Sequence, residues 1–342
     1  MRATVQSILT VLGCATQSLG YVLKEDFTGN GYRNFFDKFE YWTAADPTKG
    51  FIDYVNQDPA WQNGLIGNGG NIYIGVDHTS IAPQHGRKSL RMTSKSAFDS
   101  GTLIVADISH MVNLLAAMDR LNETSALTLE QPDTCGTWPA LWTTSQTSHW
   151  PQEGEIDIIE QANGAHYNQM SIHLSEKQGR CHVDHDSWMR ASRDRWGDCS
   201  EESQRGCNAN DPRANSFGGG FNRNGGGVYA MEWTWPHIRI WFFPRHSIPG
   251  GSSGPLGDQP DPAVWGQPTT SFEGADCELN KHFKNQHIVI DTTLCGIWAG
   301  GTWVSSGCAA GTGFETCEGY VKNKPEDFRS AFWTFKSLKV FA

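Results

Sequence analysis

The chain has 342 residues, of which 38% are hydrophobic and 19% are charged, and its formal net charge is −10. No apolar run reaches the length that spans a membrane, and no cluster of Lys and Arg offsets the negative charge, which argues against membrane insertion and against nucleic acid as a partner. The acidic balance and the 14 Trp residues favour a neutral, hydroxyl-rich ligand.

The N-terminus has the features of a secretory signal peptide. Arg2 precedes a short apolar stretch over 8–15, and small residues follow before Tyr21. We therefore expect residues 1–20 to be a signal peptide and the mature protein to be secreted, either extracellular or in the cell wall. The alternative is that the apolar stretch forms a buried first strand.

Short segments rich in β-branched and aromatic residues recur along the chain, separated by Gly, Asn and Pro. This pattern indicates an all-β sandwich or barrel. No linker divides the segments, so we expect a single domain over 21–342. The predicted strands cover 71–76, 89–92, 101–106, 140–143, 155–159, 169–174, 227–234, 238–243 and 332–341.

The stretch 112–131 differs from its surroundings. It is rich in Leu and Ala, and its apolar residues have helical spacing, which predicts an amphipathic helix on a loop. A second hypothesis is a retained intron in the gene model, because splice-site-like codons can encode the ends of the stretch. Its removal would join 108–111 directly to 132–138, and the sequon at Asn122 would then not belong to the true protein.

Eight cysteines follow the predicted signal peptide, and a ninth, Cys14, lies within it. An even number in an exported chain predicts disulfide bonds, whose connectivity the sequence leaves open. Zinc binding is the alternative. The C-x₂-C pairs that structural zinc sites favour are missing, so we expect no metal site.

The run E-I-D-I-I-E at 155–160 sets three carboxylates among isoleucines. Side chains alternate along a strand, so Glu155 and Asp157 share one face and the intervening isoleucine points into the core. Glu160 would face the other way unless a β-bulge near Ile158 shifted the parity by one residue. We therefore predict a bulge here and three carboxylates on one exposed face.

Carboxylates arranged in this way suit retaining glycoside hydrolysis. One attacks the anomeric carbon and the other protonates the leaving oxygen, which requires the two carboxyl groups to lie roughly 5–5.5 Å apart. A central carboxylate can share a proton with a neighbour and separate the pKa values of the pair. The alternative is a solvated polar strand face, because such alternation is ordinary in half-buried strands.

Three motifs around this strand carry a family resemblance. The motifs C-G-T-W-P-A-L-W (135–142), W-P-Q-E-G-E-I-D-I-I-E (150–160) and N-Q-M-S-I-H (168–173) together resemble the active-site core of glycoside hydrolase family 16. The bulged E-[IL]-D-x-x-E form is similar to that of the secreted fungal endo-β-1,3(4)-glucanases, or laminarinases. Further matches, among them W-G-Q-P (265–268), extend the resemblance from about Tyr21 to the C-terminus.

The resemblance implies a β-jelly-roll sandwich of the concanavalin A-like lectin/glucanase type with a concave substrate cleft. It implies that Glu155 is the nucleophile, Asp157 the assisting carboxylate and Glu160 the general acid/base. It also implies a β-glucan polysaccharide as the partner, a monomer, and chemistry that needs no cofactor. The residues that it assigns to substrate binding are Trp142, Trp150, His173, Trp265 and Arg91.

The implied activity is endo-acting, retaining hydrolysis of β-1,3- and mixed β-1,3/1,4-glucans by double displacement. A transglycosylase, or a hydrolase of another β-linked glycan, would use the same carboxylates and differ only in its cleft contacts. A non-catalytic glucan-binding protein is a further alternative, but it would be expected to have lost the carboxylates at 155 and 160. Two features depart from the family pattern: the insertion at 112–131, and Gln161 in place of a small residue.

Overall fold

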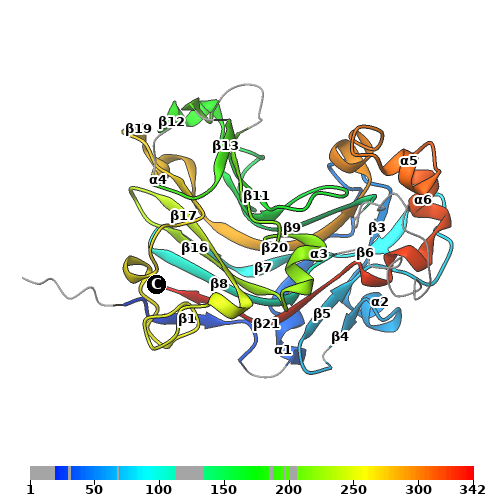
Figure 1. The fold of residues 1–342 in the computed structure, drawn as a ribbon, viewed down its shortest axis with the longest axis horizontal. Helices are drawn as coiled ribbons and strands as arrows, with labels where there is room; N and C mark the ends of the chain where they lie inside the picture. Colours follow the sequence, from blue (N-terminus) through cyan, green and yellow to red (C-terminus); the bar gives the residue numbers. More distant parts are fainter. Residues whose placement is uncertain are drawn as a thin grey trace, which may run out of the picture.

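The computed structural model describes residues 20–29, 32–67, 69–112, 135–184, 188–195, 197–200 and 206–342. Two large antiparallel sheets lie face to face, and the helices are short and peripheral (Figure 1). The predicted all-β sandwich is confirmed. Most of the expected signal peptide, up to residue 19, and the stretch 113–131 lie outside the described residues. None of the described helices is both long and apolar enough to cross a membrane.

The first sheet, called the back sheet below, has β21 near its middle. This strand is antiparallel to β8 on one side and to β5 on the other, and it also pairs with β1. In spatial order the strands are β18 (Thr270–Phe272), β17 (Ile238–Pro244), β16 (Gly227–Trp233), β8 (Thr102–His110), β21 (Phe332–Phe341), β5 (Ile72–Gly75) and β4 (Ile66–Gly67), with β1 (Leu23–Asp26) on β21.

The second sheet, called the cleft sheet below, contains the carboxylate strand β10. Strand β20 of the same sheet was not predicted from the sequence, because its apolar residues I-V-I are consecutive and polar residues flank them, which gives no alternation to detect. In spatial order the strands are β13 (Ser192–Arg195), β15 (Cys207–Asn210), β11 (Gln169–His173), β10 (Glu155–Glu160), β9 (Thr137–Ser145), β20 (Gln286–Leu294), β7 (Arg91–Phe98) and β2 (Phe39–Tyr41).

Smaller elements surround the two sheets. One three-stranded sheet has the order β14 (Gly197–Asp198), β12 (Cys181–Val183) and β19 (Asp276–Cys277), and a parallel pair is made of β3 (Ile52–Tyr54) and β6 (Arg87–Ser89). The α-helices are α1 (Tyr32–Asp37), α2 (Gln57–Gln62), α3 (Gly218–Arg223), α4 (Leu279–His282), α5 (Cys308–Thr312) and α6 (Cys317–Asn323). A π-helical turn covers Gly296–Gly300, and 3₁₀ turns cover Glu176–Gln178, Arg245–Ser247, Pro262–Val264 and Pro325–Ser330.

The main hydrophobic core lies between the two sheets. Tyr229 and Trp233 of β16 and Phe335 of β21 project into it from the back sheet, and Ile156 and Ile158 of β10 join it from the cleft sheet. Burying one such side chain contributes about 1.5–3 kcal/mol. The isoleucines of the carboxylate strand therefore hold β10 against the core and leave its other face for polar side chains.

A second apolar cluster covers the opposite face of the back sheet. Trp241 and Phe243 of β17 alternate with core residues along the strand, so they point away from the sandwich interior. Trp265 packs edge-on against both of them, with ring centroids 5.5 and 5.7 Å apart. This cluster attaches the 246–269 loop to the back sheet.

Eight cysteines form four disulfides, which confirms the predicted disulfide framework. Cys135–Cys308 joins the start of β9 to α5, and Cys295–Cys317 joins the end of β20 to α6. The other two bonds are Cys181–Cys277, between β12 and β19, and Cys199–Cys207, which joins the residue after β14 to the first residue of β15. The bonds at 135–308 and 295–317 fix the segment with α5 and α6 to the cleft sheet.

Candidate active site

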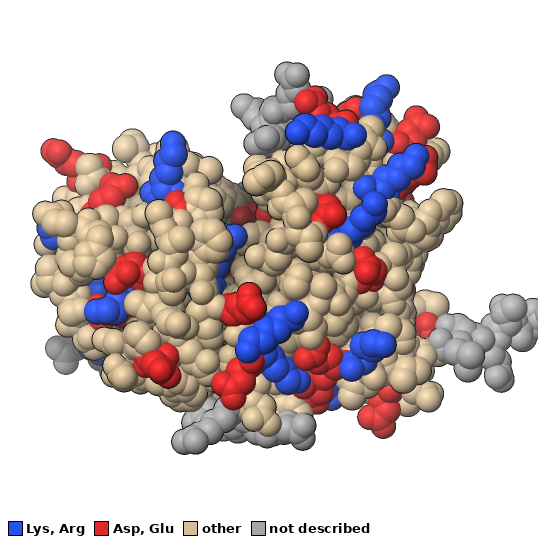
Figure 2. All heavy atoms as spheres, turned by 180° about the vertical axis from the view of Figure 1, so that it is seen from behind, with Lys and Arg blue, Asp and Glu red and all other residues tan. Residues whose placement is uncertain are grey.

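The molecule is hollowed between two raised rims. Figure 2 shows this hollow opening at the top, with acidic and basic side chains inside it. One rim carries α5 and α6, and the other carries β12, β19 and α4 (Figure 1). The cleft sheet runs between the two rims and forms the floor.

The cross-strand register sets the three carboxylates on this floor. On the β9 side the pairing passes from Asp157↔Trp142 to Ile159↔Leu141 and skips Ile158, and on the β11 side the register also shifts between Asp157 and Glu160. The extra residue is the β-bulge that the sequence predicts, so this prediction is confirmed. Glu160 therefore returns to the face of Glu155 and Asp157, while Ile156 and Ile158 stay in the core.

Two side chains contact Glu155. The indole Nε1 of Trp150 donates a hydrogen bond of 2.9 Å to Glu155 Oε2. His173 is the direct cross-strand partner of Glu155 on β11, and its Nε2 lies 4.0 Å from Glu155 Oε1. Trp150 is 48% exposed, and its ring centroid lies 6.0 Å from that of His173. The sequence-predicted residues at 150 and 173 are therefore brought together around Glu155.

Asp157 is the most enclosed of the three carboxylates. Only 2% of its surface is exposed, and its Oδ2 lies 3.4 Å from Nε2 of His173. Although burial disfavours a charged imidazole, the hydrogen bond to Asp157 and the charges of Glu155 and Glu160 raise the pKa of His173 to about 10. His173 is therefore an imidazolium at neutral pH, held between two carboxylates.

Atoms of Glu155, Asp157 and His173 lie within 4.8 Å of one another, which is close enough to hold a cation. A protonated imidazole has no lone pair to offer a metal. The raised pKa of His173 favours an Nε2 that donates a hydrogen bond to the carboxylates.

Glu160 has a different partner. The indole Nε1 of Trp138 donates a hydrogen bond of 2.8 Å to Glu160 Oε1, and the Trp138 ring meets Trp298 edge-on at 5.5 Å. Sequence reasoning assigned no role to Trp138. The alternation of side chains along a strand could have indicated a role, because residues 138, 140 and 142 of β9 share the face that forms the floor of the hollow.

Burial raises the pKa of both glutamates. For Glu155, burial and then the charge of Asp157 raise the pKa to about 8, while His173, the Trp150 N–H and Arg91 oppose the rise. For Glu160, burial and then Asp157 hold the pKa well above its ordinary value, and the Trp138 N–H opposes this. More cationic and donor groups thus favour the ionised form at Glu155 than at Glu160.

Arg91 lies further along the same floor. Its guanidinium sits over the rings of Trp142, at 4.9 Å, and Trp42, at 5.5 Å, and its Nη1 is 3.9 Å from Asp291 Oδ2. Burial raises the pKa of Asp291 to about 7, against the effect of Arg91. Trp142 is only 8% exposed, so it supports the guanidinium and offers little free ring face.

The prediction that Trp265 binds substrate is wrong. Trp265 is 7% exposed and lies in the cluster on the outer face of the back sheet, where its Nε1 donates to Ser253 O at 2.6 Å. The main core and the cleft sheet separate it from Glu155. Its physical role is to pack the 246–269 loop against Trp241 and Phe243. Gln161, the other departure noted in the sequence, is buried, and its Oε1 accepts from Ala162 N.

Known proteins share both the sequence and this architecture. The model of the XgeA-like catalytic domain of glycoside hydrolase family 16 matches residues 39–116 and 127–341. An endo-1,3(4)-β-glucanase of Arthroderma benhamiae is 36% identical over 97% of this chain and 66% of its own length. The chain spans less than half the length of several other curated fungal relatives.

Two solved structures of similar length support the fold. Laminarinase 16A from Phanerochaete chrysosporium, with β-glucans in its donor and acceptor sites, is 31% identical, with a TM-score of 0.79 over 94% of this chain and 99% of its own. An elongating family 16 β-1,3-glucosyltransferase is 36% identical, with a TM-score of 0.78 over 94% and 100% of the two chains. These matches confirm the expected β-jelly-roll sandwich. The chain belongs to glycoside hydrolase family 16 and contains its XgeA-like catalytic domain.

Proposed function

We propose that this chain is a retaining endo-β-1,3(4)-glucanase that cleaves β-glucan by double displacement. The observation that carries the proposal is the bulged strand β10, which sets Glu155 and Glu160 on one face of the hollow with different partners. Retaining chemistry needs one carboxylate that ionises readily and one that stays protonated. The pKa values of both glutamates are raised, and the cationic and donor groups around Glu155 favour its ionisation over that of Glu160.

In the first step, ionised Glu155 attacks the anomeric carbon from the α-face and forms an ester bond with the sugar. The glycosidic bond breaks as Glu160 gives its proton to the leaving oxygen. Asp157 and the imidazolium of His173 keep Glu155 oriented, because His173 Nε2 lies between the two carboxylates. Esterification removes the negative charge of Glu155. Ionisation of Glu160 then costs less free energy, because there is less repulsion from a neighbouring carboxylate.

In the second step, Glu160 is now ionised and accepts a proton from water. The resulting oxygen nucleophile attacks the anomeric carbon from the β-face, and the ester to Glu155 breaks. The product has the same anomeric configuration as the substrate, and both carboxyl groups return to their starting protonation states.

The proposed sugar contacts are those of Trp150, Arg91 and His173, and Trp142 contributes to substrate binding through the Arg91 guanidinium that it supports. Trp150 offers an exposed indole face beside Glu155, and indoles stack on the apolar faces of pyranose rings. Arg91 presents guanidinium N–H groups to sugar hydroxyls and is held in place by two tryptophans. β-Glucans occupy both donor and acceptor sites in the laminarinase from Phanerochaete chrysosporium, which supports a polysaccharide substrate here.

Transglycosylation is the second candidate activity. The solved β-1,3-glucosyltransferase matches 94% of this chain at 36% identity, compared with 31% identity for the laminarinase. The first chemical step is the same in both activities, and the acceptor in the second step decides the product. A sugar hydroxyl that reaches the glycosyl-enzyme before water gives elongation.

We also propose that the protein is secreted and acts as a monomer. Eight disulfide-bonded cysteines suit an oxidising compartment, and the fungal relatives are named as enzymes of β-glucan. Extracellular and cell-wall locations both give access to that polymer.

The test is hydrolysis of laminarin by the secreted protein beside a Glu155→Gln variant, with the product anomer followed by NMR. We expect immediate release of the β-anomer from the wild type and a loss of activity on the order of 10³-fold or more in the variant. Lichenan in parallel measures the use of mixed linkages, and longer oligosaccharides made from laminaripentaose would reveal transfer. Equal activity in the two proteins would contradict the assignment of Glu155.

A further inference from the structure

The bulge in β10 interrupts the backbone ladder beside the acid/base carboxylate. A bulge leaves backbone groups that need partners from outside the regular pairing, because buried N–H and C=O groups are costly when unpaired. One side chain supplies both partners here. Asn168 Nδ2 donates to Ile158 O at 2.9 Å, and Asn168 Oδ1 accepts from Glu160 N at 3.0 Å.

The chemistry of this contact requires an amide. Asn168 has no exposed surface and directly precedes β11. Its side chain presents one N–H donor and one C=O acceptor in a plane, as a peptide group does. It therefore takes the place of a backbone unit at the point where β10 and β11 lose register.

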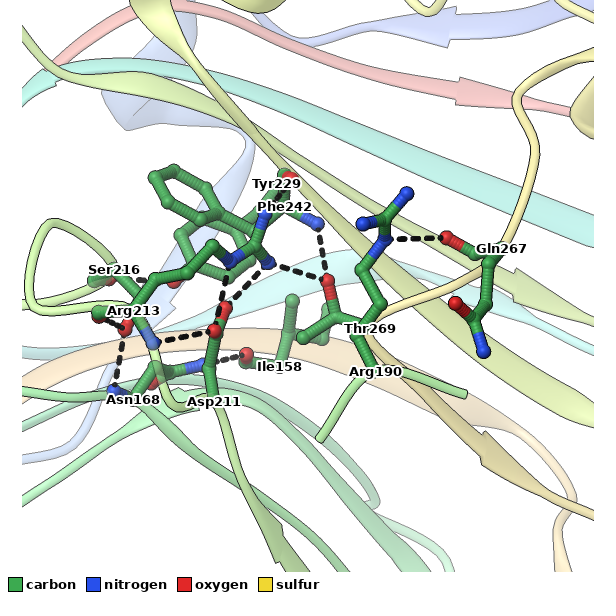
Figure 3. A network of polar contacts seen from close by, with 10 residues as sticks. All are labelled: Ile158, Asn168, Arg190, Asp211, Arg213, Ser216, Tyr229, Phe242, Gln267 and Thr269. Atoms are coloured by element: carbon green, nitrogen blue, oxygen red, sulfur yellow. Dashed lines mark hydrogen bonds and ion pairs between the residues drawn. The ribbon is translucent and has the colours of Figure 1, made fainter. Parts of the chain in front are cut away.

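The backbone of Asn168 is itself held by a second layer of contacts (Figure 3). Its N–H donates to Ser216 Oγ at 3.0 Å, and its carbonyl accepts from Asp211 N at 2.9 Å. Ser216 Oγ in turn donates to Arg213 O at 2.7 Å. The amide that clamps the bulge is thus fixed in position before substrate binds.

The second layer is anchored to the back sheet. Arg213 forms a two-pronged ion pair with fully buried Asp211, with Nε–Oδ1 and Nη2–Oδ2 distances of 2.8 and 2.5 Å. The same guanidinium donates to Phe242 O of β17 at 3.0 Å and to Thr269 Oγ1 at 2.9 Å (Figure 3). A chain of hydrogen bonds therefore connects the bulge beside the catalytic carboxylates to the other sheet.

We propose that Asn168 is a positioning residue for Glu160. It holds the bulged backbone on both sides of Ile159 and so fixes where the Glu160 side chain emerges on the cleft floor. The proposal rests on the proposed glucanase function and adds a residue that touches neither substrate nor a reacting atom. Loss of the clamp should weaken acid and base assistance by Glu160 more than nucleophilic attack by Glu155.

The test compares Asn168→Ala with the wild type on two substrates. Laminarin needs a proton from Glu160 to release its leaving group, whereas 2,4-dinitrophenyl β-laminaribioside has a leaving group that departs without one. Azide needs no general base, so it replaces water in the second step when Glu160 is misplaced. We expect kcat/KM on laminarin to fall by about 10²-fold. On the aryl glycoside we expect azide to raise kcat and to yield the β-glycosyl azide.

Asn222→Ala is the matched control. Asn222 makes the same pair of bonds to the backbone of Met111, with Nδ2–O and Oδ1–N distances of 2.9 Å each, and it joins α3 to the residue that follows β8 of the back sheet. A general effect of losing an amide clamp would appear in both variants. We expect the Asn222 variant to be insensitive to azide and to keep wild-type kcat/KM.

Ser216→Ala is a milder second variant, because it leaves the Asn168 amide in place and removes only the bonds of Ser216 Oγ to Asn168 N and Arg213 O. If Asn168→Ala does not fold, as judged by near-UV circular dichroism, the same two measurements are made on Ser216→Ala. Its kcat/KM on laminarin is then expected to fall a few-fold. Folded variants that lose activity equally on both substrates, with no response to azide, would overturn the proposal. A wild type that cleaves neither substrate would overturn the glucanase function as well.

Discussion

The indole N–H of Trp138 points at Oε1 of Glu160 across 2.8 Å, from the neighbouring strand of the cleft sheet. Burial and Asp157 raise the pKa of Glu160, and this hydrogen bond opposes them because it favours the ionised form. Trp138 therefore helps Glu160 to release its proton in the first step and to remain ionised as a base in the second.

Trp138→Phe tests this relationship, since it keeps the aromatic ring and removes the donor. We expect kcat/KM on laminarin to fall about tenfold, because one hydrogen bond to a charged group is lost. The pKa of Glu160 should rise further, so the alkaline limb of the pH–rate profile should move to higher pH. A limb that moves to lower pH would contradict the role given to this N–H.

The roles of the two glutamates can be separated by the stereochemistry of azide capture. In Glu155→Ala the α-face is vacant, so azide attacks there and gives the α-glycosyl azide. In Glu160→Ala the glycosyl-enzyme still forms from an activated aryl glycoside, and azide attacks it from the β-face to give the β-glycosyl azide. NMR of the two products distinguishes them, and the same anomer from both variants would show that the assignment is wrong.

Glu160→Gln should make the protein more stable while inactivating it. Because the folded-state pKa of Glu160 is raised above its ordinary value of 4.5, the contribution of this residue to stability is greatest below that pH. That contribution falls as the pH increases, since the unfolded chain releases the proton more readily. Glutamine does not ionise, and its oxygen still accepts from Trp138. We expect Tm to rise by about 2 °C at pH 7.

The control for this stability measurement is the same pair of proteins at pH 4. Glu160 is then mostly protonated in both states, so the difference in Tm should shrink toward zero. A Tm gain that is independent of pH would point to repacking instead of relief of a buried charge.

Trp265 and Trp150 should behave in opposite ways. Trp265→Ala removes a buried ring from the outer cluster, so we expect the free energy of unfolding to drop by about 3–5 kcal/mol, with KM for laminarin unchanged. Trp150→Ala removes an exposed ring that donates to Glu155. We expect its kcat/KM to fall about tenfold or more with little change in Tm. Chemical denaturation and laminarin kinetics on both variants would separate the two effects.

The shared face of the three carboxylates could be predicted from sequence, because the alternation of side chains along a strand depends only on their local spacing. Three acids at 155, 157 and 160 share a face only if one residue bulges, and the register skips Ile158 as required. Trp138 followed the same parity, but its partner Glu160 lies on another strand, so its role depended on the pairing of β9 with β10.

Other features depend on contacts that sequence spacing does not encode. Trp265 occurs in a family-like motif, yet its ring lies on the far side of the back sheet, because the loop that carries it folds onto Trp241. Asn168 directly precedes β11, and its clamp on Ile158 and Glu160 appears only when β10 and β11 are set side by side. Such long-range contacts are fixed by tertiary packing.

Because β21 lies near the middle of the back sheet, this sheet cannot be completed until its last strand in the sequence has been synthesised. Lys339 pairs with Val105 and Phe332 with Gly75, so early strands of the back sheet wait for partners made more than 200 residues later. Until Phe332–Phe341 leaves the ribosome, β8 and β5 each expose an unpaired edge that invites aggregation. A nascent chain stalled just short of β21 should therefore need chaperone protection, even though all three carboxylates of β10 have already been made.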